Sequence, residues 1–142
     1  MQIRELMNPA VVTVSPDSSA ATAARLLSRH NVGSLPVCAC DGKLRGIVTD
    51  RDIVLRCLAV EEDPAQTPVR EIMTRRPASI GPEADCRSAA QLMAKNQVRR
   101  LPVVEGEKLV GMVSLGDLAK CHSYDMEAAE ALSEISENII RR

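Results

Sequence analysis

The feature that most constrains this chain of 142 residues is an internal duplication. The segment Ile3–Met7 (IRELM) returns as Val69–Met73 (VREIM). Further matches are Pro16 with Pro82, residues 32–37 with 98–103 and, after one residue is lost in a turn, Asp52 with Asp117. A match that continues along a whole unit indicates two copies of one module, and the fold must accommodate both.

Each copy predicts the same order of elements, β-α-β-β-α. In the first copy, the β-branched run Val11–Val14 predicts a strand, and small residues at helical spacing predict a helix from about residue 20. Strands at 34–38 and 44–49 are joined by a turn at Asp41-Gly42, which is a hairpin signal. A second helix begins near Asp50 and runs to about Val60.

These elements predict an α/β (α+β) fold in which two tandem repeats pack about a pseudo-twofold axis. Residues 1–60 form the first copy, 61–68 a linker, 69–123 the second copy and 124–142 a C-terminal amphipathic helix. About 60 residues with three short strands bury too little apolar surface to stand alone. We therefore expect the copies to pack together and to form two related clefts.

The C-terminal segment carries an apolar stripe at helical spacing, opposite a row of glutamates. The stripe consists of Ala128, Leu132, Ile135 and Ile139. Three uses are open, namely covering the chain's own sheet, forming a dimer, or docking on a partner.

The composition excludes several classes of function. The net charge of −1 and the single aromatic residue, a tyrosine, argue against nucleic-acid binding, which relies on basic surfaces and stacking platforms. No apolar run approaches the roughly 20 residues of a membrane-spanning helix, and the N-terminus has no apolar signal region. We expect a cytoplasmic protein without membrane contact.

Two motifs occur twice and in register. The first is the Leu-Pro-Val strand (35–37 and 101–103), and the second is Gly-φ-Val-Thr/Ser-x-x-Asp, where φ is apolar (46–52 and 111–117). With these motifs the chain resembles the CBS-domain pair, named after cystathionine β-synthase, as a stand-alone, bacterial-type member. The resemblance implies a sensor of AMP, ADP, ATP, NAD or S-adenosylmethionine, bound in the clefts between the repeats.

The resemblance implies ribose contacts at the second motif, by Thr49 and Asp52 in the first copy and by Ser114 and Asp117 in the second. A carboxylate can accept hydrogen bonds from two vicinal ribose hydroxyls, as acidic residues do in dinucleotide folds. A neighbouring hydroxyl can donate to the ribose or accept from it. The alternative is that each pair only caps a helix.

The two copies differ in front of the Leu-Pro-Val strand. Arg99 and Arg100 precede it in the second copy, where the first copy has Gly33 and Ser34. Arginine suits bidentate contact with phosphate oxygens, so we expect Arg99 and Arg100 to bind phosphate and the second copy to be the tighter site. Strand alternation sends them to opposite faces, and a solvated surface role remains the alternative. Arg51 is the weaker candidate for the first copy.

Adenine needs a dry slot, which here must be aliphatic. The candidates for base contact, by side chain or by main chain, are Thr13, Val14, Ile47, Ser79, Ile80 and Met112. The four aliphatic members can equally be core residues.

No catalytic motif is present, so we predict no enzyme activity, no cofactor and no metal site. Cys38 and Cys40 lie on one face of a strand, but only two ligands are local, and we interpret them as structural.

The sequence therefore predicts a non-enzymatic regulatory module, with a regulatory adenine nucleotide as its ligand. It would signal through protein–protein contacts, as a homodimer and toward an unidentified protein target. The alternative is an interaction module that has lost nucleotide binding.

Overall fold

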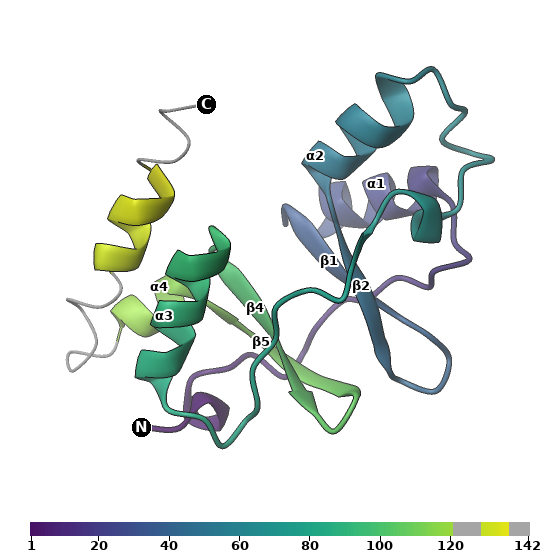
Figure 1. Cartoon of the computed structure of the whole chain (residues 1–142). Coiled ribbons are helices and arrows are strands. Elements are labelled where there is room, and N and C mark those ends of the chain that lie inside the picture. The colour runs from purple at the N-terminus through teal and green to yellow at the C-terminus, as the bar shows by residue number, and fades with distance from the viewer. Residues whose placement is uncertain (121–128, 137–142) are drawn as a thin grey trace. The chain divides into compact units, whose positions relative to one another are not determined.

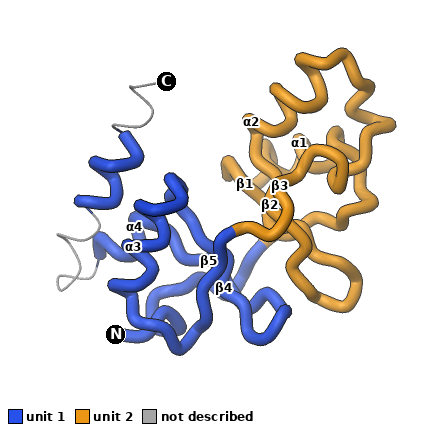
Figure 2. The backbone as a smooth tube through the Cα atoms, in the orientation of Figure 1, with its two compact units in different colours: residues 1–11, 78–142 blue, residues 12–77 orange. Residues whose placement is uncertain are grey.

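The computed structural model describes residues 1–120 and 129–136, which fall into two compact units (Figure 2). Unit 1 contains residues 1–11 and 78–142, and unit 2 contains residues 12–77. Each unit is a small antiparallel sheet with helices packed on it (Figure 1). The predicted mixed α/β class is confirmed. No helix within the described ranges is long and apolar enough to cross a membrane.

Unit 2 is built from the first copy and the segment that follows it. Its three-stranded antiparallel sheet has the order β1-β2-β3. The elements are α1 (Ala20–His30), β1 (Ser34–Cys38), β2 (Leu44–Thr49), α2 (Asp50–Ile53), the π-helical η2 (Val54–Leu58), η3 (Val69–Glu71) and β3 (Thr74–Arg75). The buried face of α1 packs Ala20, Ala23 and Leu27 into one apolar cluster with the central residues of β1 and β2.

Unit 1 follows a similar plan with the second copy, but its antiparallel sheet is two-stranded. Its elements are η1 (Ile3–Glu5), α3 (Cys86–Asn96), β4 (Arg100–Glu105), β5 (Lys108–Ser114) and α4 (Leu115–Ala119). Residues 129–136 form a further helix, which we call the tail helix. Its Ala131 belongs to the core cluster of this unit, together with Met93 of α3 and Leu101 of β4.

The segment that opens each copy packs against the hairpin and helices of the other copy. In unit 1, the N–H of Ile3 donates to the Ala84 carbonyl (2.9 Å). In unit 2, the N–H of Val69 donates to the Ser18 carbonyl (2.8 Å). The side chains of Ile3 and Val69 are fully buried. The same hydrogen bond therefore forms at equivalent positions of the two units. In each unit the donor opens one copy and the acceptor belongs to the other copy.

Several expectations need adjustment. The run Val11–Val14 forms no strand: only Val14 pairs, in a parallel bridge with Val37, because a turn at residues 15–18 leads the chain away directly afterwards. The two hairpin strands have the expected bounds.

In the C-terminal segment Ile135 is buried but Leu132 is exposed, while Ala128 and Ile139 lie outside the described residues.

Two glycines allow the segments that open the copies to approach the sheets. We call these segments, residues 1–8 and 67–74, the exchanged segments. A Cβ at Gly46 would lie 2.6 Å from the carbonyl oxygen of Thr74, which belongs to the pairing strand β3. A Cβ at Gly111 would lie 2.8 Å from the sulfur of Met7 and 3.0 Å from the carbonyl oxygen of Asn8. Equivalent positions of the two copies therefore meet the same steric requirement.

We expect Gly46→Ala to lower the free energy of unfolding by roughly 1–3 kcal/mol, because the new methyl group collides with backbone that cannot move without losing the β2–β3 pairing. Urea denaturation measures this change. Gly81→Ala is the matched control, since its Cβ would meet its nearest neighbour, the Val104 carbonyl, at 4.0 Å. Equal effects of the two substitutions would contradict the steric explanation.

Candidate functional site

The predicted ribose-binding pair of the second copy forms a reciprocal capping box at the start of α4. The N–H of Ser114 donates to Oδ2 of Asp117 (2.8 Å), and the N–H of Asp117 donates to Oγ of Ser114 (3.1 Å). Thr49 and Asp52 make the same pair of bonds before α2, at 2.9 and 3.0 Å. The capping alternative is thus realised in both copies.

The capping boxes leave the carboxylates of Asp52 and Asp117 able to accept further hydrogen bonds, because each oxygen can accept more than one. Oδ1 of Asp117 lies 4.0 Å from Nζ of Lys120, and 27% of the Asp117 side chain is exposed. Oδ1 of Asp52 lies 3.8 Å from Nε of Arg56, and only 12% of that side chain is exposed. The carboxylate of the second copy is therefore the more accessible of the two.

The two arginines of the second copy lie beside this capping box. Arg100 pairs with Ser114 across β4 and β5, and the carbonyl of Arg99 accepts a hydrogen bond from the N–H of Leu115 (2.8 Å). Arg99 precedes β4, so strand alternation does not separate the two side chains. Both line a pocket of about 630 Å³ in unit 1. Its lining residues are Arg99, Arg100, Ser114, Leu115, Gly116, Ala119, Ala129 and Leu132.

This pocket combines two cations and a hydroxyl with an apolar side, and its volume is typical of small-molecule sites. Such a lining suits a ligand with an anionic group and an apolar part. Sequence reasoning did not assign Ala129 and Leu132 of the tail helix to a binding site. The amphipathic stripe was the signal that included Leu132, but it placed this side chain in a buried interface.

The equivalent position in unit 2 lacks the arginine pair. Ser34, which replaces Arg100, pairs with Thr49 across β1 and β2. Arg51, the predicted phosphate ligand of the first copy, is exposed on α2, and its N–H donates to Oδ1 of Asp50 (2.8 Å). Unit 2 therefore offers one arginine where unit 1 offers two.

The candidate base contacts form one pair in each unit. In unit 2, the N–H of Val14 donates to the Pro36 carbonyl (3.1 Å), and Ile47 pairs with Pro36 across the hairpin. In unit 1, Ile80 and Met112 flank Pro102 in the same way. Val14, Ile80 and Met112 are buried, Ile47 and Ser79 are half-buried, and Thr13 is exposed.

Cysteine chemistry finds little support at the first hairpin. Burial raises the pKa of the Cys38 thiol, and the nearby Asp41 carboxylate adds to this shift. A raised pKa disfavours the thiolate that redox reactions and metal binding require. Among residues 1–120 and 129–136, no group of three or more His, Cys, Asp or Glu side chains is placed to hold a metal ion.

The hairpins, the capping boxes and their internal repetition match a known domain. The CBS domain family matches residues 3–58 and 69–124, which is more than half of the chain. The chain belongs to the CBS domain family. Its relative YhcV, a CBS domain-containing protein of Bacillus subtilis, is 45% identical over 134 residues, covering 94% of each chain.

Two solved structures with CBS domains were determined with adenosyl compounds bound. CBSX2 in complex with AMP is 28% identical, with a TM-score of 0.74 over 84% of this chain and 93% of that chain. The CBS domain pair of MJ0100, in complex with 5′-methylthioadenosine and S-adenosyl-L-methionine, is 28% identical, with a TM-score of 0.74 over 84% and 94%. Two proteins of similar structure thus bind adenosine-containing ligands.

We expect Ser114→Ala to lower the free energy of unfolding by about 1 kcal/mol, because the N–H of Asp117 loses its capping acceptor. Thermal and urea denaturation measure the change. Ser88→Ala, at an exposed position of α3, is the control and should stay within about 0.5 kcal/mol of the parent. A Ser114→Ala protein as stable as the parent would show that the capping box contributes nothing.

Proposed function

We propose that this CBS pair is a regulatory module whose main ligand site is the pocket of unit 1. Its ligand is an adenosyl compound such as AMP, ADP, ATP, NAD or S-adenosylmethionine. The observation that carries the proposal is the gathering of Arg99, Arg100 and Ser114 around one pocket, beside Asp117. The complexes of CBSX2 and MJ0100 with adenosyl compounds support the choice of ligand class.

Each part of such a ligand has a candidate partner. Arg99 and Arg100 contact the phosphate, or the charged group of a ligand that lacks one. Ser114 and Asp117 contact the ribose, with the capping box holding the carboxylate in place. Ile80 and Met112, with the main chain at Ser79, stay the candidate base contacts from the sequence, although they do not line this pocket. The first copy uses Thr49, Asp52 and Arg51 with Thr13, Val14 and Ile47, and binds more weakly because it lacks the arginine pair.

The module regulates rather than catalyses. A ligand can change the packing of the module against another protein only through different affinities for two states. We propose that binding in unit 1 creates such a difference and that the signal passes through protein–protein contacts. The competing function is a ligand-free interaction module, and the observation in its favour is that all four ribose candidates already serve as helix caps.

We expect Asp117→Asn to weaken binding of the preferred ligand by about 10- to 100-fold, because a charged acceptor for the ribose hydroxyls is lost. An amide oxygen remains to accept the hydrogen bond from the N–H of Ser114. Calorimetric titration with AMP, ATP, NADH and S-adenosylmethionine measures this loss. The matched control is Asp52→Asn, the same change at the equivalent position of the first copy, which should leave the tight site unchanged.

The titration also decides between the two functions. If none of the four compounds binds the parent protein or raises its melting temperature, the interaction module is the better description. If binding occurs but is insensitive to Asp117→Asn, the ligand lies elsewhere.

We also propose that a second copy of the chain covers an exposed apolar surface formed by η2 and the turn that follows it. Val54, Leu55, Leu58 and Val60 are each about half exposed. A twofold interface needs a self-complementary surface. Arg51 precedes this face and the exposed Glu61 and Glu62 follow it, so two antiparallel copies would place opposite charges together.

Leu58→Glu should shift the molar mass measured by light scattering from that of a dimer toward the 15.4 kDa of one chain. The effect is large because a twofold interface contains the substitution twice. Ser28→Glu adds the same charge on an exposed part of α1 and should leave the dimer intact. A parent protein of 15.4 kDa would exclude the dimer.

A further inference from the structure

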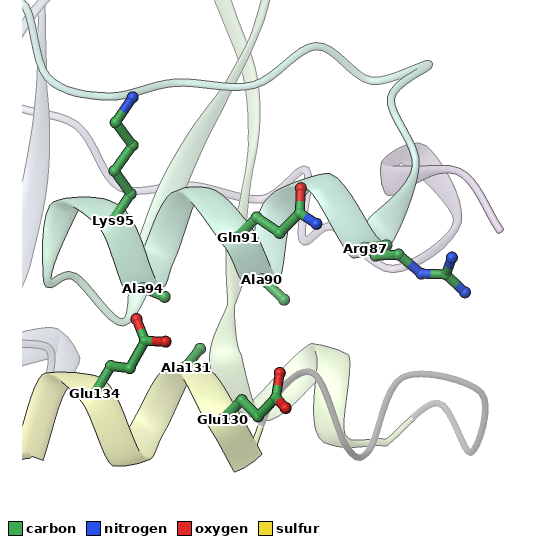
Figure 3. Close-up of a pocket in the computed structure, with 8 residues that line it drawn as sticks. All are labelled: Arg87, Ala90, Gln91, Ala94, Lys95, Glu130, Ala131 and Glu134. Carbon is green, nitrogen blue, oxygen red and sulfur yellow. The ribbon is translucent and has the colours of Figure 1, made fainter.

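The tail helix is anchored to unit 1 by small apolar contacts. Ala131 and Ile135, one helical turn apart, are both buried. Figure 3 shows Ala131 pointing toward α3, whose Ala90 and Ala94 point toward the tail helix. Small side chains allow two helices to lie close together, and Ala131 belongs to the same apolar cluster as Ala90. This contact fixes one face of the tail helix against the domain.

A second face of the tail helix lines the arginine pocket. Ala129 and Leu132 are three residues apart and therefore lie on one side of the helix. Both contribute to the pocket that contains Arg99, Arg100 and Ser114. Leu132 is 42% exposed, so part of its apolar side chain is available for contact. The second copy thus supplies the basic side of the pocket, and the tail helix supplies part of its apolar side. The tail helix lies outside the matched CBS domains, which end at residue 124.

We propose that the tail helix is part of the ligand site, with Leu132 as a specificity residue that covers the apolar part of the adenosyl ligand. This inference rests on the proposed function, because it assumes that the ligand occupies this pocket. A ligand held between the arginines and Leu132 contacts both the domain and the tail helix. Ligand binding and docking of the tail helix then strengthen each other by the same factor, as linkage requires.

The linkage gives the module an output. When the ligand binds, the tail helix is held more firmly against α3, and when the ligand leaves, this helix detaches more readily. Because Glu130 and Glu134 lie at the groove between α3 and the tail helix, detachment changes the charge presented on this face of unit 1. A protein partner that recognises either the docked helix or the uncovered α3 face would therefore bind with an affinity that depends on whether the pocket holds a ligand.

The test compares Leu132→Ala with two other variants in calorimetric titrations with AMP, ATP, NADH and S-adenosylmethionine. Leu132→Ala should weaken the preferred ligand about five- to tenfold, because roughly half a leucine side chain of apolar contact is lost. Ser133→Ala, an exposed tail-helix position outside the pocket, should have no effect. Arg100→Ala should weaken the same ligand more strongly than Leu132→Ala.

Hydrogen exchange supplies the second readout. In the parent protein, the preferred ligand should slow amide exchange in residues 129–136, and in Leu132→Ala this protection should shrink by the same factor as the affinity.

The two hypotheses fail in different ways. Unchanged or tighter binding by Leu132→Ala, with binding lost in Arg100→Ala, would overturn the role of the tail helix and leave the proposed function standing. No binding by the parent protein would overturn both.

Discussion

The exchange of the two segments that open the copies is the constraint on which the rest of the structure depends. Ile3 fills the core of the unit that contains the second copy, and Val69 fills the core of the other. Two equivalent ion pairs accompany them, Arg4 with Glu83 at 3.0 Å and Arg70 with Asp17 at 2.7 Å. These exposed pairs add little free energy, whereas each fully buried aliphatic side chain contributes on the order of 2–3 kcal/mol. Each unit is therefore completed by a segment that lies outside its own repeat.

This constraint explains which parts of the repeat are equal and which are not. Gly46 and Gly111 are both glycine because an exchanged segment approaches each sheet at the same place. The capping boxes are equal because both second helices must start directly after a strand. The side chains of the two residues before the Leu-Pro-Val strand meet no such steric requirement. These residues are two arginines in one copy and glycine and serine in the other. The copies thus share their architecture but differ in the chemistry available to a ligand.

Much of the fold was accessible from sequence because its signals are local. The hairpin strands, the Asp41-Gly42 turn and the N-terminal caps depend on residues close together in sequence, and the strand bounds at 34–38 and 44–49 are confirmed. The exchange was not accessible, because Ile3 and Val69 are nearly interchangeable in sequence and either fits either hairpin. At the candidate site, residue type predicted the arginines. Their joint position in one pocket depends on Arg99 lying before the strand, which periodicity does not specify.

The C-terminal segment shows a different limit of sequence reasoning. Periodicity grouped Leu132 with Ile135 as one apolar stripe, but small residues on α3 accept Ala131 instead and rotate Leu132 toward the arginine pocket. An alanine gives a weak hydrophobic signal, yet it determines the docking face because it permits the closest approach. The larger side chain is then left for another use. Leu132 therefore keeps its apolar surface for the pocket that it lines together with Arg99, Arg100 and Ser114.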